Sequence, residues 1–120
     1  MGQRVSIQLC LVIPCPASAD ALRAYLAAHQ PGGVPSAVLE GMKAAGIEGC
    51  HIYHAQDRLV MVIDASDGFS MASAAAINRG NAVVQQWNRR MAALLSGDDR
   101  NAPPWNEAHC IFDLERHLRP

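Results

Sequence analysis

The sequence lacks an excess of charge of one sign, and it lacks any long apolar run. Its 120 residues carry a formal net charge of −1 at pH 7, so nucleic acid is not an expected partner. No stretch of about eighteen apolar residues is present, so we expect no membrane-spanning helix and no membrane partner. We find no internal repeat and no low-complexity segment. A globular chain of this length predicts one domain over residues 1–120.

The cysteines have no spacing typical of a metal or redox motif, because no two of them form a C-x-x-C pair. Half of the residues are hydrophobic, which is enough for a core without a disulfide framework. We therefore expect reduced thiols and a cytoplasmic location. The four cysteines are Cys10, Cys15, Cys50 and Cys110.

The N-terminal residues have a faint likeness to a signal peptide, since Arg4 precedes an apolar stretch and a small-residue segment. Two features favour a β-strand instead. Gln8 interrupts the apolar region, and apolar residues alternate with polar ones, which is strand periodicity. The alternating apolar residues are Val5, Ile7, Leu9, Leu11 and Ile13.

Periodicity and chain breakers divide the sequence into strands and helices. Pro14 and Pro16 end the first strand, because proline cannot donate to a strand ladder. Ser18 or Asp20 can cap the first helix, and Asn81 can cap the last one. The predicted strands are 5–14, 47–55, 59–65 and 106–114, and the predicted helices are about 19–29, 35–45, 69–77 and 82–95.

This order predicts an α+β fold, a ferredoxin-like βαββαβ antiparallel sheet with its helices on one face. The second and third strands, joined by a short turn at Gln56 and Asp57, form a hairpin. The strands offer apolar side chains to both faces of the sheet, but the chain's own helices can cover only one. We therefore expect the open face to pack on a second copy in a homodimer.

Tyr25 and His29 are the pair around which a site can form. They are four residues apart, which places both on one side of the first predicted helix. A phenol and an imidazole side by side can hold a hydroxyl-rich ligand and transfer a proton. Structural alternatives remain, because His29 could cap the helix end and Tyr25 could be a core residue. Trp87, at helical spacing with Val84 and Met91, could likewise belong to the core.

Histidines and cysteines near the second and last predicted strands raise the question of a metal site, since both residue types bind zinc. Adjacent strand residues point to opposite faces, so neighbours such as Cys50 and His51 cannot easily chelate one ion. We therefore expect no bound metal. The residues concerned are Cys50, His51, His54, His109 and Cys110.

Four groups of short motifs occur in an order and spacing typical of a known family. They are Tyr25-x-x-x-His29 with Pro31 and Pro35; Lys43-Ala-Ala-Gly-Ile, Ile52-Tyr53 and Asp57-Arg58-Leu59-Val60-Met61; Val84-Gln85-Gln86-Trp87 leading to Met91; and Pro104-Trp105 with Ile111-Phe112-Asp113-Leu114. On these residues the chain resembles the L-rhamnose/L-fucose mutarotase family, which has a ferredoxin-like, dimeric α/β-barrel fold. The resemblance covers most of the chain.

The resemblance implies an aldose 1-epimerase, an isomerase that interconverts the α and β anomers of a 6-deoxy-L-sugar such as L-fucose or L-rhamnose. By the same resemblance His29 matches the proton donor, Tyr25 a substrate-binding tyrosine, and Trp87 an aromatic residue that lines the sugar site. Asn88 would add hydrogen bonds to sugar hydroxyls. Acid–base ring opening requires no cofactor, so a monosaccharide is the expected ligand.

The residue that carries the second proton is left open between His51 and His109, which we also include in the substrate-binding set. If the strands are placed correctly, each could lie on a face toward the helices. That placement rests on alternation, which can slip by one residue.

Departures from the family pattern keep two other functions open. Val34 and Ser36 stand where the family has a tryptophan and a glutamate, and Asn88 interrupts an aromatic pair. Cys50 stands where rhamnose-type members have a tyrosine. The fucose-like branch of the family also lacks this tyrosine. The alternatives are a cofactor-independent monooxygenase of the same barrel fold, with a mostly apolar pocket, and a non-catalytic sugar-binding dimer.

Overall fold

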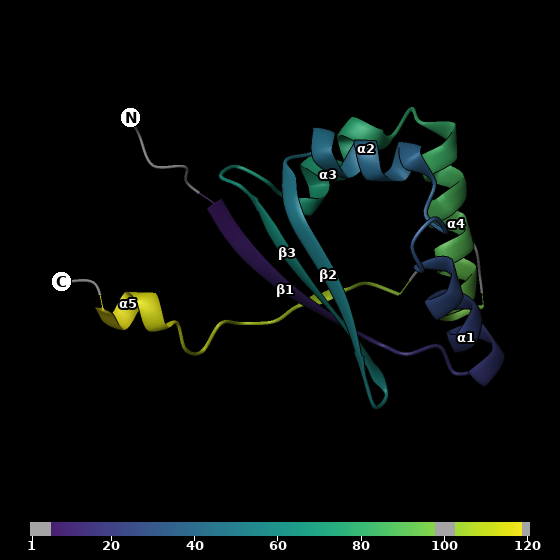
Figure 1. Cartoon of the computed structure of the whole chain (residues 1–120), viewed down its shortest axis with the longest axis horizontal. Helices are drawn as coiled ribbons and strands as arrows, with labels where there is room; N and C mark the ends of the chain where they lie inside the picture. Colours follow the sequence, from purple (N-terminus) through teal and green to yellow (C-terminus); the bar gives the residue numbers. More distant parts are fainter. Residues whose placement is uncertain (1–5, 98–102, 119–120) are drawn as a thin grey trace.

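The computed structural model describes residues 6–97 and 103–118, and Figure 1 shows the path of the chain. Predictions for Val5, for loop residues 98–102 and for tail residues 119–120 lie outside the described residues. In chain order the elements are β1 (Ser6–Pro14), α1 (Ala19–Ala28), α2 (Ser36–Ala44), β2 (Ile47–Ala55), β3 (Arg58–Ser66), α3 (Met71–Asn78), α4 (Ala82–Ser96), β4 (Asn106–Glu107) and α5 (Leu114–Leu118).

The strands form an antiparallel sheet in the order β2-β3-β1-β4. β1 pairs with β3 along its whole length, with Leu11 opposite Met61, and β2 and β3 form the predicted hairpin. Helices α1 to α4 all lie on one side of this sheet (Figure 1). The predicted ferredoxin-like α+β fold, with helices on one face, is therefore confirmed.

The two faces of the sheet differ because successive strand residues point to opposite sides. On the helix-facing side, Ile13, Leu59 and Ile63 are almost completely buried. Ile13 and Leu59 pack with Met91 of α4, which ties the sheet to the helical layer. The register places a second set on the other side, which we call the open face: Gln8, Cys10, Val12, His51, Tyr53, Val60, Val62 and Asp64.

Local capping determines where the helices begin. The Ser18 hydroxyl accepts a hydrogen bond from the Ala21 amide at 3.3 Å, so Ser18 is the predicted cap of α1. Asn81 caps α4 as predicted, because its side chain accepts from the amides of Val83 and Val84. No helix in the described part of the chain is long and apolar enough to cross a membrane.

The last predicted strand, residues 106–114, is wrong in length. β4 spans only Asn106–Glu107, and the chain leaves the sheet after the Ala108 amide donates to the Cys10 carbonyl at 2.7 Å. Among the described residues β4 pairs with β1 alone, so no second strand there holds the chain in an extended register beyond this point. Instead, the Asp113 carboxylate accepts a hydrogen bond from the Glu115 amide at 3.0 Å and starts α5.

Candidate active site

Tyr25 and His29 lie against each other at the C-terminal end of α1. Their ring centroids are 4.4 Å apart and the ring planes are tilted by 31°. Tyr25 is only 3% exposed and packs with Ile13 and Leu59 of the sheet, whereas His29 is half-buried. The helical spacing therefore brings a phenol and an imidazole together at the layer between the sheet and the helices.

One ring nitrogen of His29 is hydrogen-bonded to the backbone. His29 Nδ1 lies 2.7 Å from the Tyr25 carbonyl oxygen, and a carbonyl can only accept, so Nδ1–H is the donor. In the neutral ring this leaves Nε2 without a proton, and Nε2 is then the atom that can accept or return one. The capping interpretation of His29 is thus confirmed, and it is compatible with acid–base chemistry at the opposite nitrogen.

Trp87 brings an indole ring to the same place from α4. Its ring centroid lies 5.3 Å from that of His29, in an edge-to-face arrangement with an interplanar angle of 68°. Trp87 is half-buried and packs against the same core cluster as Tyr25, so the core interpretation holds in part. The Arg90 guanidinium carbon is 5.8 Å from the Trp87 ring centroid. The indole ring of Trp87 therefore stands beside the imidazole of His29.

Cys50 approaches Tyr25 from β2. It lies opposite Ile63 on the helix-facing side of the sheet and packs against the core around that residue. Burial raises the pKa of the Cys50 thiol, which therefore stays protonated at neutral pH. Burial, and secondarily the proximity of Cys50, raise the pKa of Tyr25 to about 12. The Tyr25 hydroxyl is accordingly a neutral group that can donate a hydrogen bond.

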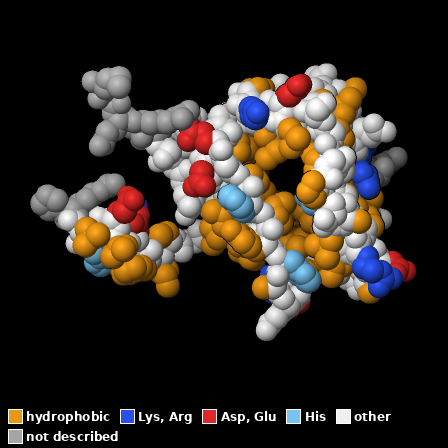
Figure 2. All heavy atoms as spheres, viewed as in Figure 1, with side chains coloured by type: hydrophobic (Ala, Val, Ile, Leu, Met, Phe, Trp, Pro, Cys, Tyr) orange, Lys and Arg blue, Asp and Glu red, His pale blue; other side chains and the backbone are white. Residues whose placement is uncertain are grey.

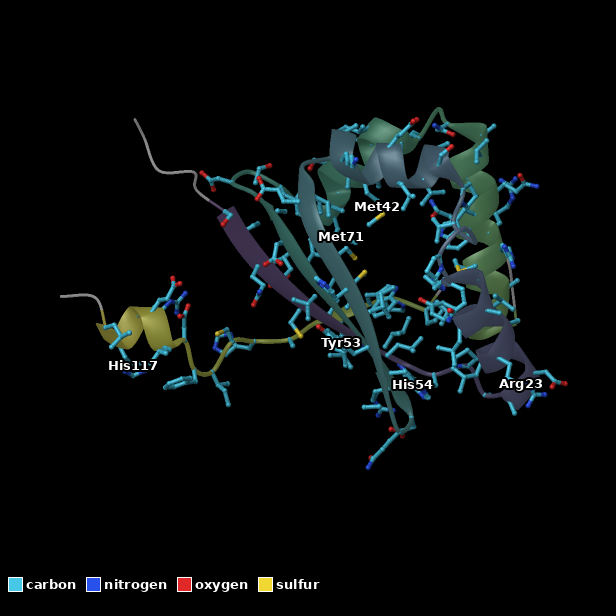
Figure 3. All side chains as sticks on the ribbon, in the orientation of Figure 1. Arg23, Met42, Tyr53, His54, Met71 and His117 are labelled. Atoms are coloured by element: carbon cyan, nitrogen blue, oxygen red, sulfur yellow. The ribbon has the colours of Figure 1, made fainter. Side chains whose placement is uncertain are left out.

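Space for a ligand exists between the sheet and the helices. Figure 2 shows an opening bounded by β2 on one side and by α1 and α4 on the other, with mainly hydrophobic side chains on its walls. Met42 points from α2 into this opening (Figure 3). A mostly apolar hollow with a few polar groups is the usual form of a small-molecule site.

Comparison with known proteins assigns the chain to a family. The family model described as L-rhamnose mutarotase matches residues 8–114. The chain belongs to this family. An L-fucose mutarotase of Xanthomonas campestris pv. campestris is 30% identical over 109 residues, which cover 89% of this chain and 87% of that protein. Membership of the mutarotase family makes the chain an isomerase-type enzyme.

The open face carries one of the histidines expected beside the site. His51 lies opposite Val62, so the expectation that it faces the helices is wrong. It is exposed and stacks on Tyr53, with ring centroids 6.2 Å apart. The reason is the one-residue ambiguity of strand alternation, which the pairing register with β3 resolves.

His109 and Asn88 are both exposed, whereas Tyr25, His29 and Trp87 form the aromatic cluster. His109 follows β4 and lines a shallow groove of about 220 Å³ with Gln8 and Cys10 of β1, on the opposite edge of the sheet from β2. Asn88 adjoins Trp87 on α4 and is turned by about 100° around the helix axis. Their predicted roles in substrate binding stay predictions.

His54 is a residue that the sequence reasoning weighed only as a metal ligand. It lies opposite Leu59, so it shares the helix-facing side of β2 with Cys50. Its Nε2 lies 3.0 Å from the Gln56 carbonyl, and its ring is exposed near the β2–β3 turn (Figure 3). The period of two from Cys50 through Ile52 to His54 is the signal that could have found it. Within the described residues no cluster of histidine, cysteine and acidic side chains could hold a metal ion.

Proposed function

We propose that this mutarotase family member is an aldose 1-epimerase that interconverts the anomers of a 6-deoxy-L-sugar. The observation that carries the proposal is the contact of His29 with Tyr25 on one side and Trp87 on the other. The family match and the name of the Xanthomonas relative support a sugar of the L-rhamnose or L-fucose type.

The chemistry assigned to His29 is proton transfer at the sugar ring oxygen. A protonated imidazole donates from Nε2 to the ring oxygen while a base takes the proton of the anomeric hydroxyl, and the C1–O5 bond breaks. The open aldehyde rotates about C1–C2, and reversal of the same transfers closes the ring as the other anomer. General acid–base catalysis of this kind contributes about 10²–10⁴-fold in rate.

Tyr25 and Trp87 would hold the sugar in place. The neutral Tyr25 hydroxyl donates a hydrogen bond to a sugar oxygen, because its raised pKa keeps it protonated. The indole of Trp87 offers its face to the C–H groups of the ring. The second proton carrier is best sought at His54, which shares a sheet face with Cys50, rather than at His51.

The proposed sugar preference follows from Cys50. A thiol at this position, near enough to Tyr25 to influence its pKa, is smaller than a tyrosine and leaves room for a ligand. The Xanthomonas relative, an L-fucose mutarotase by name, supports a fucose-type substrate. We therefore favour L-fucose over L-rhamnose as the better substrate.

The open face supports a homodimer as part of the proposal. Val12 and Val60 face each other across β1 and β3, and Val62 lies at the next open-face position of β3, opposite Cys10. Tyr53, opposite Val60 on β2, is 56% exposed. Packing of this face on a second copy would remove apolar surface from water. Light scattering across a concentration series would detect the dimer, and a monomer at every concentration would contradict it.

The function is tested by saturation-transfer NMR of anomer exchange with L-fucose, L-rhamnose and D-glucose. We expect exchange above the uncatalysed rate for the two deoxy sugars, greater for L-fucose. Absence of enhancement with every sugar would overturn the mutarotase proposal. Sugar-dependent thermal stabilisation without exchange would then identify a non-catalytic sugar-binding dimer. Oxygen uptake with a quinol would identify a monooxygenase.

A further inference from the structure

The proposed ring opening needs two proton carriers, and the aromatic cluster supplies only His29. The reaction requires an acid at the ring oxygen and a base at the anomeric hydroxyl. Burial raises the pKa of Tyr25 to about 12 and also raises the pKa of the Cys50 thiol, so both groups keep their protons at neutral pH. The indole N–H of Trp87 can only donate. The base must therefore come from another part of the site.

One imidazole of β2 lies on the same side of the sheet as this cluster. His54 faces the helices, whereas His51 lies on the open face and His109 follows β4 at the opposite edge of the sheet. Figure 3 shows His54 and Tyr53 on opposite sides of β2, with His54 on the side of α1. His54 therefore borders the opening of Figure 2.

The register of β2 on β3 places His54 near Tyr25. His54 is paired with Leu59, and Leu59 belongs to the same core cluster as Tyr25. Side chains at directly opposed positions of antiparallel strands have Cβ atoms about 4.5–5.5 Å apart. Cys50, on the same side of β2, lies near enough to Tyr25 to influence its pKa. The stretch of β2 beside Tyr25 thus has a thiol at one end and an imidazole at the other.

A hydrogen bond to the β2–β3 turn orients the His54 ring. Its Nε2 lies 3.0 Å from the Gln56 carbonyl oxygen, and a carbonyl can only accept, so in the neutral ring Nε2 carries the proton and Nδ1 does not. Gln56 lies in the left-handed region, at a φ of 54°. The Cys15 amide donates to the Asp57 carbonyl at 2.8 Å. The acceptor that orients His54 therefore belongs to a turn that is tied to the connection between β1 and α1.

His29 and His54 are held through opposite ring nitrogens. His29 is fixed through Nδ1, which leaves Nε2 for proton transfer, and His54 is fixed through Nε2, which leaves Nδ1. Each imidazole therefore has one nitrogen on a backbone carbonyl and one that can gain or lose a proton. The rings come from the end of α1 and from β2, which are two walls of the opening. A sugar in the opening would meet one ring from each wall.

We propose that His54 is the second proton carrier of the mutarotase reaction and that its Nδ1 removes the proton of the anomeric hydroxyl. During ring opening the proton of O1 passes to His54 Nδ1, the proton of His29 Nε2 passes to O5, and the C1–O5 bond breaks as the C1=O1 bond forms. Ring closure reverses both transfers, so the two histidines regain their starting protonation. A bound sugar shields the exposed His54 ring from water. The inference rests on the proposed function and supplies the base that it requires.

The first test measures whether a sugar reaches His54, without reference to catalysis. Protein labelled with ¹⁵N-histidine is titrated with L-fucose and with L-rhamnose, and the ring nitrogen resonances are followed by NMR. Variants with single His→Gln changes assign the signals. We expect the Nδ1 resonance of His54 and the Nε2 resonance of His29 to shift, and those of His117 in α5 to stay in place.

This titration distinguishes failure of the inference from failure of the proposed function. A sugar that shifts His29 but not His54 would overturn the role of His54 alone. A sugar that shifts neither ring would overturn the sugar site together with the role of His54. If wild-type protein shows no anomer exchange with any sugar, the proposed function fails, and a shift at His54 would then mark it as a binding residue only, which overturns its role as a proton carrier.

The second test removes the proposed base. His54→Ala and His54→Gln are compared with His117→Ala, a matched control because His54 and His117 are both exposed. We expect kcat for anomer exchange to fall about 10²-fold in both His54 variants, with KM changed by less than about twofold, because a proton carrier acts on the chemical step. The control should keep the wild-type rate, and circular dichroism verifies folding. A wild-type kcat in either His54 variant would assign the ring to the turn alone.

The third test returns a base to the site. Free imidazole is added to His54→Ala and to wild-type protein, and the exchange that imidazole gives without protein is subtracted. We expect the rate of His54→Ala to rise at least about tenfold, because a small imidazole can occupy the space of the deleted ring and accept the proton. The rate of the wild-type protein should not change. Equal responses of the two proteins would overturn the assignment of proton transfer to His54.

Discussion

A histidine lies beside a tyrosine on each side of the sheet, once at the end of α1, which packs on the helix-facing side, and once on β2 at the open face. On the helix-facing side, the rings of His29 and Tyr25 are 4.4 Å apart, with Tyr25 buried. On the open face, the rings of His51 and Tyr53 are 6.2 Å apart, and both side chains are exposed. The same two residue types therefore occur in a packed layer and on a bare surface.

This difference shows what enclosure adds to residue type. His29 has Nδ1 held by a backbone carbonyl and a third ring, that of Trp87, against its side. Burial raises the pKa of Tyr25 to about 12. A preorganised group in a water-poor setting can transfer a proton to a bound sugar, whereas an exposed imidazole mainly meets solvent.

The largest expected effect separates the two histidines. His29→Ala should lower the anomer exchange rate by about 10²–10⁴-fold, because it removes the proposed proton carrier. His51→Ala should change the rate by less than about twofold, because the ring faces away from the site. Saturation-transfer NMR on both variants measures this. Equal losses of exchange rate in both variants would contradict the predicted difference between the two histidines. A His29→Ala variant that keeps its exchange activity would assign the proton transfer to His54 or His109.

Substitutions at two neighbouring residues of β3 measure how much each face of the sheet contributes to the free energy of unfolding. Leu59→Ala should lower the free energy of unfolding by about 2–5 kcal/mol, because Leu59 is fully buried against α1 and α4. Val60→Ala should cost roughly 1 kcal/mol, because its side chain lies on the open face. Denaturant unfolding of the two variants at low protein concentration gives the values. A loss at Val60 as large as that at Leu59 would mean that the open face is covered as thoroughly as the other.

The two tyrosines should differ in alkaline solution. The folded pKa of Tyr25 lies above its ordinary value of 10.0, at about 12, so the folded state holds the proton more tightly. The protonated hydroxyl therefore contributes about 2–3 kcal/mol to the free energy of unfolding. This contribution is complete below pH 10 and is lost as the pH rises from about 10 to 12. Tyr25→Phe should therefore flatten the fall of unfolding free energy over that range. Tyr53→Phe, the exposed control, should leave the slope unchanged, and an equal change in both variants would contradict the assignment.

The smallest effect concerns sugar affinity. Trp87→Ala should weaken L-fucose binding by about tenfold, since a stacked aromatic contributes about 1 kcal/mol or slightly more. Tyr53→Ala, which removes an aromatic ring from the open face, should leave the affinity unchanged. Isothermal titration or thermal shift against sugar concentration distinguishes them. Unchanged affinity in Trp87→Ala would assign this indole to packing alone.

The order and type of most elements could be predicted because they depend on local rules. Ser18 and Asn81 cap their helices as expected, and alternating side chains place β1 correctly. The last strand failed because an edge strand depends on neighbours that local sequence does not specify. The prediction that His51 faces the helices failed for a related reason. Alternation alone does not tell which side of a strand the helices cover until the pairing register is known.

The sequence by itself determined the fold class, the family and the Tyr25–His29 pair, because helical spacing forces residues four apart onto one side. The family resemblance already implied that Trp87 of α4 lines the site, and its contact with His29 agrees with this. Only the tertiary structure decided that Cys50 of β2 approaches the pair while His51 does not. Contacts between segments distant in the chain depend on how the helical layer packs on one face of the sheet. The same packing leaves the open face and the apolar side chains of residues 111–118 uncovered, because four helices on one side cannot shield both faces of the sheet.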